Sequence, residues 1–336
     1  MKLGVLLFPQ PRMSAPLARM VEGLGFDSLV FADTQNLTPE VWGQLMLAAR
    51  DTERIELGTG VTNPGTRDAA VTASAALALQ VESQGRAICG IGRGDSSLAK
   101  IGRQPTPVAE FEIYVERLQR YLRGEEVDRD GTPSRLEWHA DAQVPKVPVE
   151  VAATGTRVIE VAARHADRIV FALGADEDRI ARGIEIARRA AAASGRDPDA
   201  LQLGAWVNAV VHPDMVAARA AVRGGLAVFA HFSGFAGMKP EAMDPSLRDA
   251  ALHLRSRYDM RDHGRAGGSH AQHLDDVFID RFGIVGPLET AVPRFQRLAG
   301  LGLDFCRVVP GSRDAPPEIV SASMVHLATE VRAAVA

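Results

Sequence analysis

The chain has 336 residues, of which 46% are hydrophobic and 24% are charged, so it could form one large barrel or two smaller domains. Its net charge of −4 offers no basic surface for nucleic acid. No stretch approaches the roughly 18 consecutive apolar residues that a membrane-spanning helix needs. Residues 2–8 run into Pro9-Gln10-Pro11-Arg12 without a cleavage site, which indicates a first strand and not a signal peptide. We therefore expect a cytoplasmic protein without nucleic-acid or membrane partners.

Short apolar runs alternate along the chain with segments of helical periodicity. The predicted strands cover residues 2–8, 28–33, 55–62, 87–94, 147–153, 168–174, 201–211 and 305–310. The predicted helices cover residues 14–24, 39–51, 67–83, 107–123, 156–165, 176–194, 213–230, 287–300 and 316–335. The strands are nearly continuous in hydrophobicity, as expected when both faces of a parallel sheet are buried. Eight strands separated by helices favour a (β/α)8 TIM barrel, with a doubly wound open sheet as the alternative.

A single TIM-barrel domain over residues 1–336 leaves a surplus over the typical barrel of about 250 residues. Two stretches hold this surplus. Residues 124–146 are predicted to form a short excursion with a hairpin around Asp130-Gly131. Residues 231–276 are richer in Gly, His, Arg and Asp, and we expect this insertion to form a lid over the functional rim.

The two cysteines each lie in an apolar run. Cys89 and Cys306 are therefore expected to be buried thiols and not a disulfide or a metal pair. Because no Cys/His cluster has metal-ligand spacing, we expect no zinc site.

Two predicted strands end in residues with small side chains at the carboxyl end, where a parallel barrel holds its active site. One ends in Gly60-Val61-Thr62 and the next in Gly92-Arg93-Gly94. Such small residues make a wall that a flat cofactor can approach closely. The second motif does not complete a dinucleotide-binding fingerprint, because no strand about 20 residues later ends in an acidic residue.

Thr154-Gly155-Thr156 joins a predicted strand to a helix that starts near Arg157. Free N–H groups and the helix dipole converge at such a junction and favour a phosphate. Arg93 could add a charge-assisted hydrogen bond to the same group. The alternative is an ordinary helix cap made by Thr154 or Thr156.

Three titratable residues are candidates for catalysis. Asp33 and Asp95 follow predicted strands, and either could transfer a proton if burial raised its pKa. The alternative for both is helix capping. His263 lies in the polar cluster 258–264, where we weigh a substrate role for it or for Arg261 against an ordinary solvated loop.

The chain resembles the luciferase-like flavin and deazaflavin oxidoreductases, and within them the methylenetetrahydromethanopterin-reductase-like branch. The motifs that carry the resemblance are Gly60-Val61-Thr62-Asn63-Pro64, Thr66–Ala73, Gly85–Ser96 and Phe282–Glu289. The resemblance implies a TIM barrel whose strand ends hold an isoalloxazine-type ring without covalent attachment. It also implies a non-prolyl cis peptide between Gly60 and Val61 that supports the ring.

The resemblance also implies a set of cofactor-binding positions, with the cofactor phosphate at the junction of the fifth strand and its helix. The positions are Gly60, Val61, Thr62, Arg93, Gly94, Ala153, Thr154, Gly155, Thr156, Leu173 and Gly174, with Ala172 beside them.

The resemblance leaves two cofactors open. Relatives that use coenzyme F420 tend to carry an acidic residue where Asp95 stands, but several have Asp-His where this chain has Asp33-Thr34. Bacterial luciferase, which uses FMN, has an Arg-Gly that resembles Arg93-Gly94. We expect coenzyme F420, with FMN as the alternative.

The expected function is hydride transfer between F420 and a small organic substrate, with Asp33 or Asp95 handling the proton. The alternative is a monooxygenase that receives reduced FMN from a separate flavin reductase. Relatives commonly form homodimers through helices near the second and third strands. Alternatives of other classes are a non-catalytic cofactor-binding protein and a barrel hydrolase or aldolase that uses the two aspartates.

Overall fold

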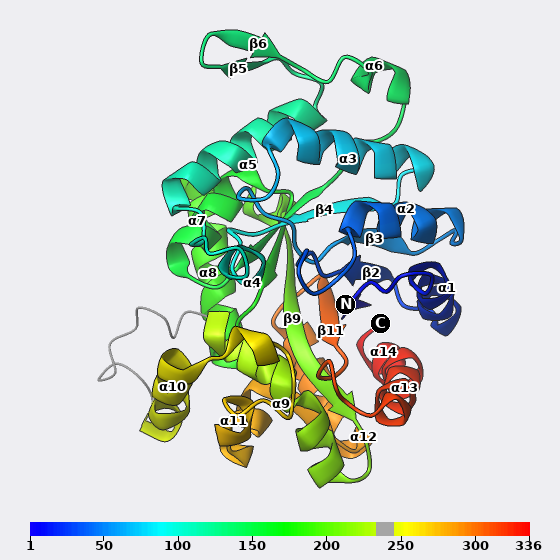
Figure 1. Cartoon of the computed structure of the whole chain (residues 1–336), viewed down its shortest axis with the longest axis vertical. Helices are drawn as coiled ribbons and strands as arrows, with labels where there is room; N and C mark the ends of the chain where they lie inside the picture. The colour runs from blue at the N-terminus through cyan, green and yellow to red at the C-terminus, as the bar shows by residue number, and fades with distance from the viewer. Residues whose placement is uncertain (233–244) are drawn as a thin grey trace.

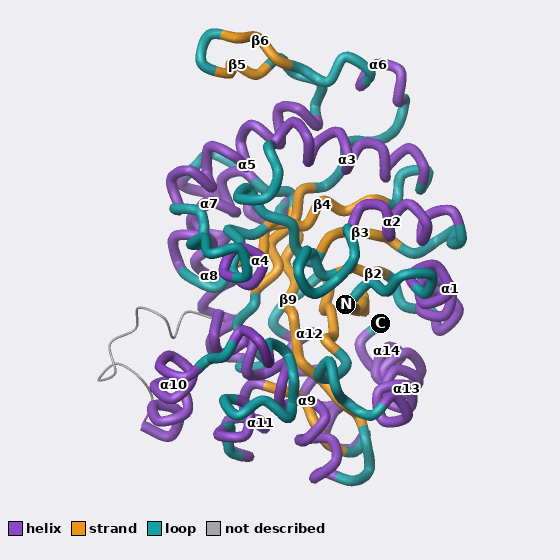
Figure 2. The backbone as a smooth tube through the Cα atoms, in the orientation of Figure 1, coloured by secondary structure: helices purple, strands orange, loops and turns teal. Residues whose placement is uncertain are grey.

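A computed structural model, which describes residues 1–232 and 245–336, shows a closed parallel barrel surrounded by helices (Figures 1 and 2). The barrel strands are β1 (Lys2–Leu7), β2 (Ser28–Phe31), β3 (Glu56–Thr59), β4 (Ala87–Ile91), β7 (Val149–Ala153), β8 (Arg168–Phe171), β9 (Gln202–Val211) and β11 (Phe305–Val309). They pair in chain order, and β9 closes the ring by pairing with both β8 and β11. All eight lie where the sequence predicts strands. The TIM barrel is therefore confirmed, and the open sheet is wrong.

The predicted helices are also confirmed. They are α1 (Ser14–Leu24), α2 (Val41–Arg50), α3 (Ala69–Glu82), α5 (Val108–Leu122), α7 (Thr156–His165), α8 (Glu177–Ala193), α9 (Met215–Phe232), α12 (Leu288–Gly300) and α13 (Pro317–His326), which continues through a π-helical turn (Leu327–Val331) into α14 (Arg332–Val335). Side chains fix several helix starts: Asp68 accepts from the Ala70 N–H at α3, and Asp176 accepts from the Arg179 N–H at α8. The helices cover the outer face of the barrel (Figure 2).

Several short elements have no counterpart in the sequence prediction. They are α4 (Ser96–Ala99), α6 (His139–Ala142), α10 (Pro245–Arg257), α11 (Asp276–Phe282), β10 (Gly283–Gly286) and the 3₁₀ turns Pro198–Ala200, Met260–Asp262 and Ala271–His273. Strand β10 lies outside the ring and pairs with the second half of β9, whose first half pairs with the barrel. Four residues bounded by glycines give too short a pattern to predict a strand.

The two predicted insertions have different outcomes. Residues 127–134 form the expected hairpin, with β5 (Val127–Arg129) and β6 (Thr132–Ser134) joined by Asp130 and Gly131 at φ of 55° and 86°. Figure 1 shows this hairpin beyond α3 and α5. Of the predicted lid 231–276, residues 233–244 lie outside the described residues, and the rest packs around α9 and α11.

Helix α9 has the length and apolar composition of a membrane-spanning helix, unlike any other helix in the two described ranges. It packs against β9, β10 and α11. Its buried residues include Ala218, Val222 and Leu226, while Arg219 pairs with Asp276 and Asp280. The apolar residues of α9 are thus explained by its packing against these elements.

The interior of the barrel holds a buried ion pair. Arg307 of β11 reaches across to Glu150 of β7, and the two side chains are 1% and 0% exposed. The Arg307 Nε–H also donates to Ser28 Oγ of β2 at 3.1 Å. A Cβ on Gly4 would come within 2.1 Å of that hydroxyl oxygen, so the glycine leaves room for it. Three strands are thereby joined through one guanidinium group.

We expect Glu150→Gln to lower the free energy of unfolding by about 3–5 kcal/mol, because it leaves the Arg307 charge buried without a counterion. Urea denaturation followed by circular dichroism measures this. Glu185→Gln is the control, since its pair with Arg189 is exposed. A loss below about 1 kcal/mol in Glu150→Gln would contradict a stabilising role for the pair.

Candidate functional site

A cavity of about 1090 Å³ opens at the carboxyl ends of the barrel strands. We call it the barrel-mouth cavity. Of the residues predicted from the sequence, ten line it: Asp33, Gly60, Val61, Arg93, Gly94, Asp95, Thr154, Gly155, Thr156 and His263. Its floor is apolar, because Leu6, Val30 and Ala32 pack there with Phe8, Trp206 and Val309. All three candidate catalytic residues therefore share one space.

Four predicted cofactor residues do not line the cavity. Side chains alternate along a strand, so Ala152 and Ala172 face the cavity while Ala153 and Leu173 are buried in the core under the helices. Thr62 is fully buried, and its backbone forms an isolated parallel β-bridge with Ile91 of β4. Gly174 adopts a φ of +76° beside the rings of Phe229 and Phe282. These four residues support the wall from behind.

The wall formed by β3 and β4 has little room for side chains. The peptide between Gly60 and Val61 is cis, as the resemblance implied. A Cβ on Gly60 would lie 2.7 Å from Val30 Cγ2. Gly94 has a φ of +81°, and a Cβ there would lie 2.6 Å from Leu98 Cδ1. A flat group can therefore approach the backbone along this wall.

One end of the cavity is suited to an anion. Helix α7 begins at Thr156, its N-cap is Gly155, and no side chain caps it, so the alternative of a threonine cap is wrong. The first N–H groups of a helix lack acceptors within the helix. Arg93 and Arg157 border the same end, and neither pairs with a carboxylate of the described chain. Burial lowers the pKa of Arg93, and the positive charge of Arg157 lowers it further.

Asp33 is not a helix cap. The N-cap of α2 is Glu40, whose carboxylate accepts from the Gly43 N–H at 2.7 Å. Asp33 Oδ2 is buried and has no hydrogen-bond partner within residues 1–232 and 245–336. Burial raises the pKa of Asp33, while nearby Thr62 and Arg67 oppose the shift. The carboxyl group therefore holds its proton more tightly than an ordinary aspartate.

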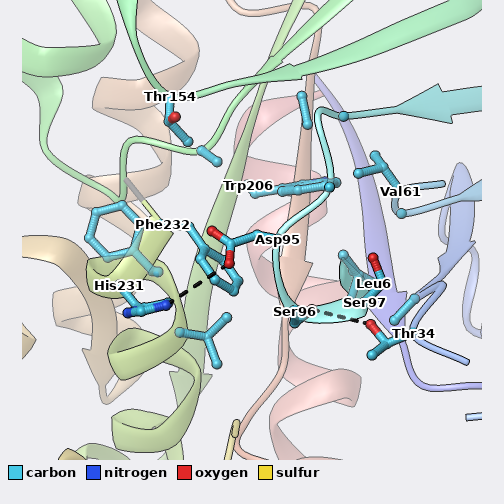
Figure 3. A pocket seen from close by; sticks show the side chains of 18 of the residues that line it. Leu6, Thr34, Val61, Asp95, Ser96, Ser97, Thr154, Trp206, His231 and Phe232 are labelled. Carbon is cyan, nitrogen blue, oxygen red and sulfur yellow. Dashed lines mark hydrogen bonds and ion pairs between the residues drawn. The ribbon is translucent and has the colours of Figure 1, made fainter. Parts of the chain in front are cut away.

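Asp95 makes no side-chain cap either, although it precedes α4. Burial raises its pKa to about 7, and Arg93 opposes the shift. Figure 3 shows His231 facing it, with 4.0 Å between His231 Nε2 and Asp95 Oδ1. Burial, and then His270, lower the pKa of His231 to about 4. Near neutral pH the cavity thus holds a carboxyl group that can give or take a proton beside a neutral imidazole.

His263 belongs to an aromatic cluster and not to a solvated loop. The residue is 4% exposed, and its Nδ1 lies 2.8 Å from the Tyr258 hydroxyl. Tyr258 stacks on His231, with centroids 3.9 Å apart. Arg261, the other substrate candidate of this segment, has a 90% exposed side chain paired with Asp259. Of the two, only His263 reaches the cavity.

Several other residues that line the cavity were not predicted from the sequence. Trp206 and Asn208 alternate along β9, and strict alternation within the predicted strand 201–211 could have placed them on the inner face. Arg313 follows β11, as Phe8 follows β1. His231 comes from the last turn of a helix, for which no strand-end signal exists.

Residues 8–304 match the family described as "Luciferase-like monooxygenase". The chain belongs to this family. The 5,10-methylenetetrahydromethanopterin reductase of Methanolobus tindarius is 28% identical to this family member over 309 residues, which cover 90% of each chain.

Solved structures share the fold. The coenzyme F420-dependent tetrahydromethanopterin reductase of Methanopyrus kandleri has a TM-score of 0.77 at 23% identity, and the alignment covers 98% of each chain. The oxygenating constituent of 3,6-diketocamphane monooxygenase from Pseudomonas putida, in complex with FMN, has a TM-score of 0.67 at 16% identity, with 100% of this chain and 99% of that chain covered. This family member is thus a luciferase-like oxidoreductase, related to reductases and similar in fold to FMN monooxygenases.

The raised pKa of Asp95 predicts how Asp95→Asn changes stability with pH. Unfolded aspartate ionises near 3.8 and folded Asp95 near 7, so between these values the folded state binds the proton more tightly. The wild type should therefore lose stability relative to Asp95→Asn as the pH rises from about 4 to about 7, and the difference should level off above that. Urea unfolding of both proteins across this range measures it.

Asp141→Asn, on the exposed helix α6, is the control for the loss of one charge. A constant difference between wild type and Asp95→Asn over this pH range would show that Asp95 ionises as an ordinary aspartate.

Proposed function

We propose that this protein is an F420-dependent oxidoreductase that transfers a hydride to or from a small organic substrate. The observation that carries the proposal is a single cavity that holds both an anion-binding end and a titratable carboxyl group. The anion-binding end has an uncapped helix N-terminus and two arginines, and Asp95, two residues after Arg93, has a pKa of about 7. A ring cofactor with a phosphate needs the anion-binding end, and proton-coupled hydride transfer needs the carboxyl group. The higher TM-score of the F420-dependent reductase supports this choice.

The residues present fit a deazaflavin. Its ring would lie against Gly60, Val61 and Gly94, where the backbone leaves room for a flat group. Its phosphate would lie at Thr154-Gly155-Thr156, within reach of Arg93. Thr62, Ala153, Leu173 and Gly174 would support these contacts from behind.

The cofactor would supply the hydride, and the protein would supply orientation and protons. Asp95 would exchange a proton with the substrate, because its pKa lies near neutral pH. Asp33, whose pKa burial raises, would lie near the ring with a carboxyl oxygen that has no partner among the described residues. His263 would contact the substrate from the lid segment. We propose that this segment, whose described part borders the cavity, excludes water from it.

A specific observation keeps FMN as a second candidate. Arg93-Gly94 borders the anion-binding end, and the FMN-bound neighbour shares the fold. In that case a separate reductase would supply reduced FMN, and the protein would act as a monooxygenase on its substrate.

Parallel fluorescence titrations with coenzyme F420 and with reduced FMN test the proposal. We expect F420 to bind with a Kd at least about tenfold below that of reduced FMN, which corresponds to about 1.4 kcal/mol. Tighter binding of reduced FMN would instead support the monooxygenase, and binding of neither would refute both.

The anion-binding end predicts the effect of Thr156→Glu. A carboxylate at the first turn of α7 would occupy the place of the phosphate and repel it, so the Kd for F420 should rise by about 100-fold. Thr132→Glu, on the exposed strand β6, is the matched control and should bind as the wild type does. Normal affinity of Thr156→Glu would place the phosphate elsewhere.

A further inference from the structure

Tyr258 and His263 form a partly buried polar contact beside the barrel-mouth cavity, which His263 lines. The Tyr258 hydroxyl lies 2.8 Å from His263 Nδ1, and no other hydrogen bond to the His263 ring exists in the part of the chain that the structure describes. His263 directly follows the turn Met260–Asp262 and lines the cavity. Because Nδ1 faces Tyr258 and the residue lines the cavity, Nε2 is the ring nitrogen left to face a ligand there.

Either the Tyr258 hydroxyl or His263 Nδ1 could donate this hydrogen bond, and the other partners of the two groups decide which one does. If His263 Nδ1 carried the proton, the Tyr258 O–H would have no acceptor among the residues described. In the opposite arrangement the phenol donates to Nδ1, and the Gly264 backbone N–H faces the phenol oxygen. Burial raises the pKa of Tyr258, so the phenol keeps its proton. The neutral imidazole must then carry its own proton on Nε2.

The surroundings keep His263 neutral. Burial lowers its pKa to about 3, and the neighbouring His231, Lys100 and Arg313 add to the shift. Lys100, which follows α4, donates to the Met260 carbonyl at 2.8 Å, and Arg313 donates to the His263 carbonyl at 3.0 Å. The titratable and charged groups that face the ring are His231 from α9, Tyr258 and His270 from the insertion, Lys100 and Arg313.

We propose that Tyr258 is a positioning residue that holds His263 in the Nε2–H tautomer, so that the cavity presents a neutral N–H donor to an oxygen atom of the substrate. This inference rests on the proposed function. The donor and the cationic Arg313, which also lines the cavity, favour a group that becomes negative during the reaction and disfavour a cationic iminium. The substrate class is therefore a carbonyl compound, or the corresponding alcohol in the reverse direction.

With F420 bound, the cofactor would supply a hydride to the carbonyl carbon, and the π electron pair of the C=O bond would move to oxygen. His263 Nε2–H stabilises the negative oxygen, which then takes the proton of the Asp95 carboxyl group. The carbonyl compound is reduced by two electrons, and the deazaflavin is oxidised by two.

Nitrogen NMR of histidine tests the tautomer without cofactor or substrate. The protein has nine histidines, and the His263 signals are assigned as those missing from His263→Gln. We expect Nε2 to be protonated and Nδ1 to be unprotonated, with no titration between about pH 5 and about pH 8, because the pKa of His263 is about 3. In Tyr258→Phe the two nitrogen shifts should move toward each other as the tautomers mix. A protonated Nδ1 in the wild type would overturn the inference.

Turnover of a ketone by F420-loaded protein gives the second readout. His263→Leu should lower kcat by about 10²–10³-fold, as expected for the loss of a donor to a developing negative charge, and His263→Gln should recover part of it. Tyr258→Phe should lower kcat by about tenfold without changing the Kd for F420. Tyr121→Phe is the matched control, because it removes a buried phenol that donates to Ser134 away from the cavity.

The two readouts separate the possible failures. Failure of the wild type to bind F420, with the expected His263 tautomer, would refute the proposed function alone, and binding of F420 without turnover of a ketone would refute the carbonyl substrate class. Full activity of His263→Leu would refute the donor role even if F420 binds. Preferential turnover of imines over ketones would refute the substrate class.

Discussion

The closed parallel barrel constrains everything else in this protein, because its interior must be filled at one end and open at the other. Within the ring, Arg307, Glu150 and Ser28 fill the space with a buried polar network. At the carboxyl end the inward-facing positions change to Gly60, Gly92 and small alanines. The cavity exists because these positions carry almost no side chain. Its apolar floor then separates the solvent-accessible mouth from the buried ion pair.

The charges around the cavity serve two purposes. At α7 an uncapped N-terminus and two arginines concentrate positive potential, and no carboxylate of the described residues forms an ion pair with either arginine. In the same cavity, burial holds Asp33 and Asp95 toward their protonated forms and His231 and His263 toward their neutral forms. Low dielectric strengthens both effects. The same burial that shapes the pocket therefore sets its proton chemistry.

The sequence predicted the architecture well, since strand hydrophobicity and helix periodicity are local properties. It also placed Gly60, Val61 and Gly94 on the wall. It could not fix the phase of alternation at a strand end, which is why it counted Leu173 as a cofactor-binding position and Ala172 only as a neighbour, although Ala172 is the one that faces the cavity. The contact of His231 with Asp95 was out of reach, because a helix and a loop far apart in the chain meet only in the folded structure.

A structure of the protein bound to coenzyme F420 tests the account most directly, because it locates both ends of the cofactor at once. We predict that the phosphate contacts the α7 N-terminus and Arg93, and that the ring lies on Gly60-Val61 with its hydride-carrying carbon toward Asp95 and His263. A phosphate bound away from α7, or a ring whose reactive carbon faces away from both residues, would contradict the account.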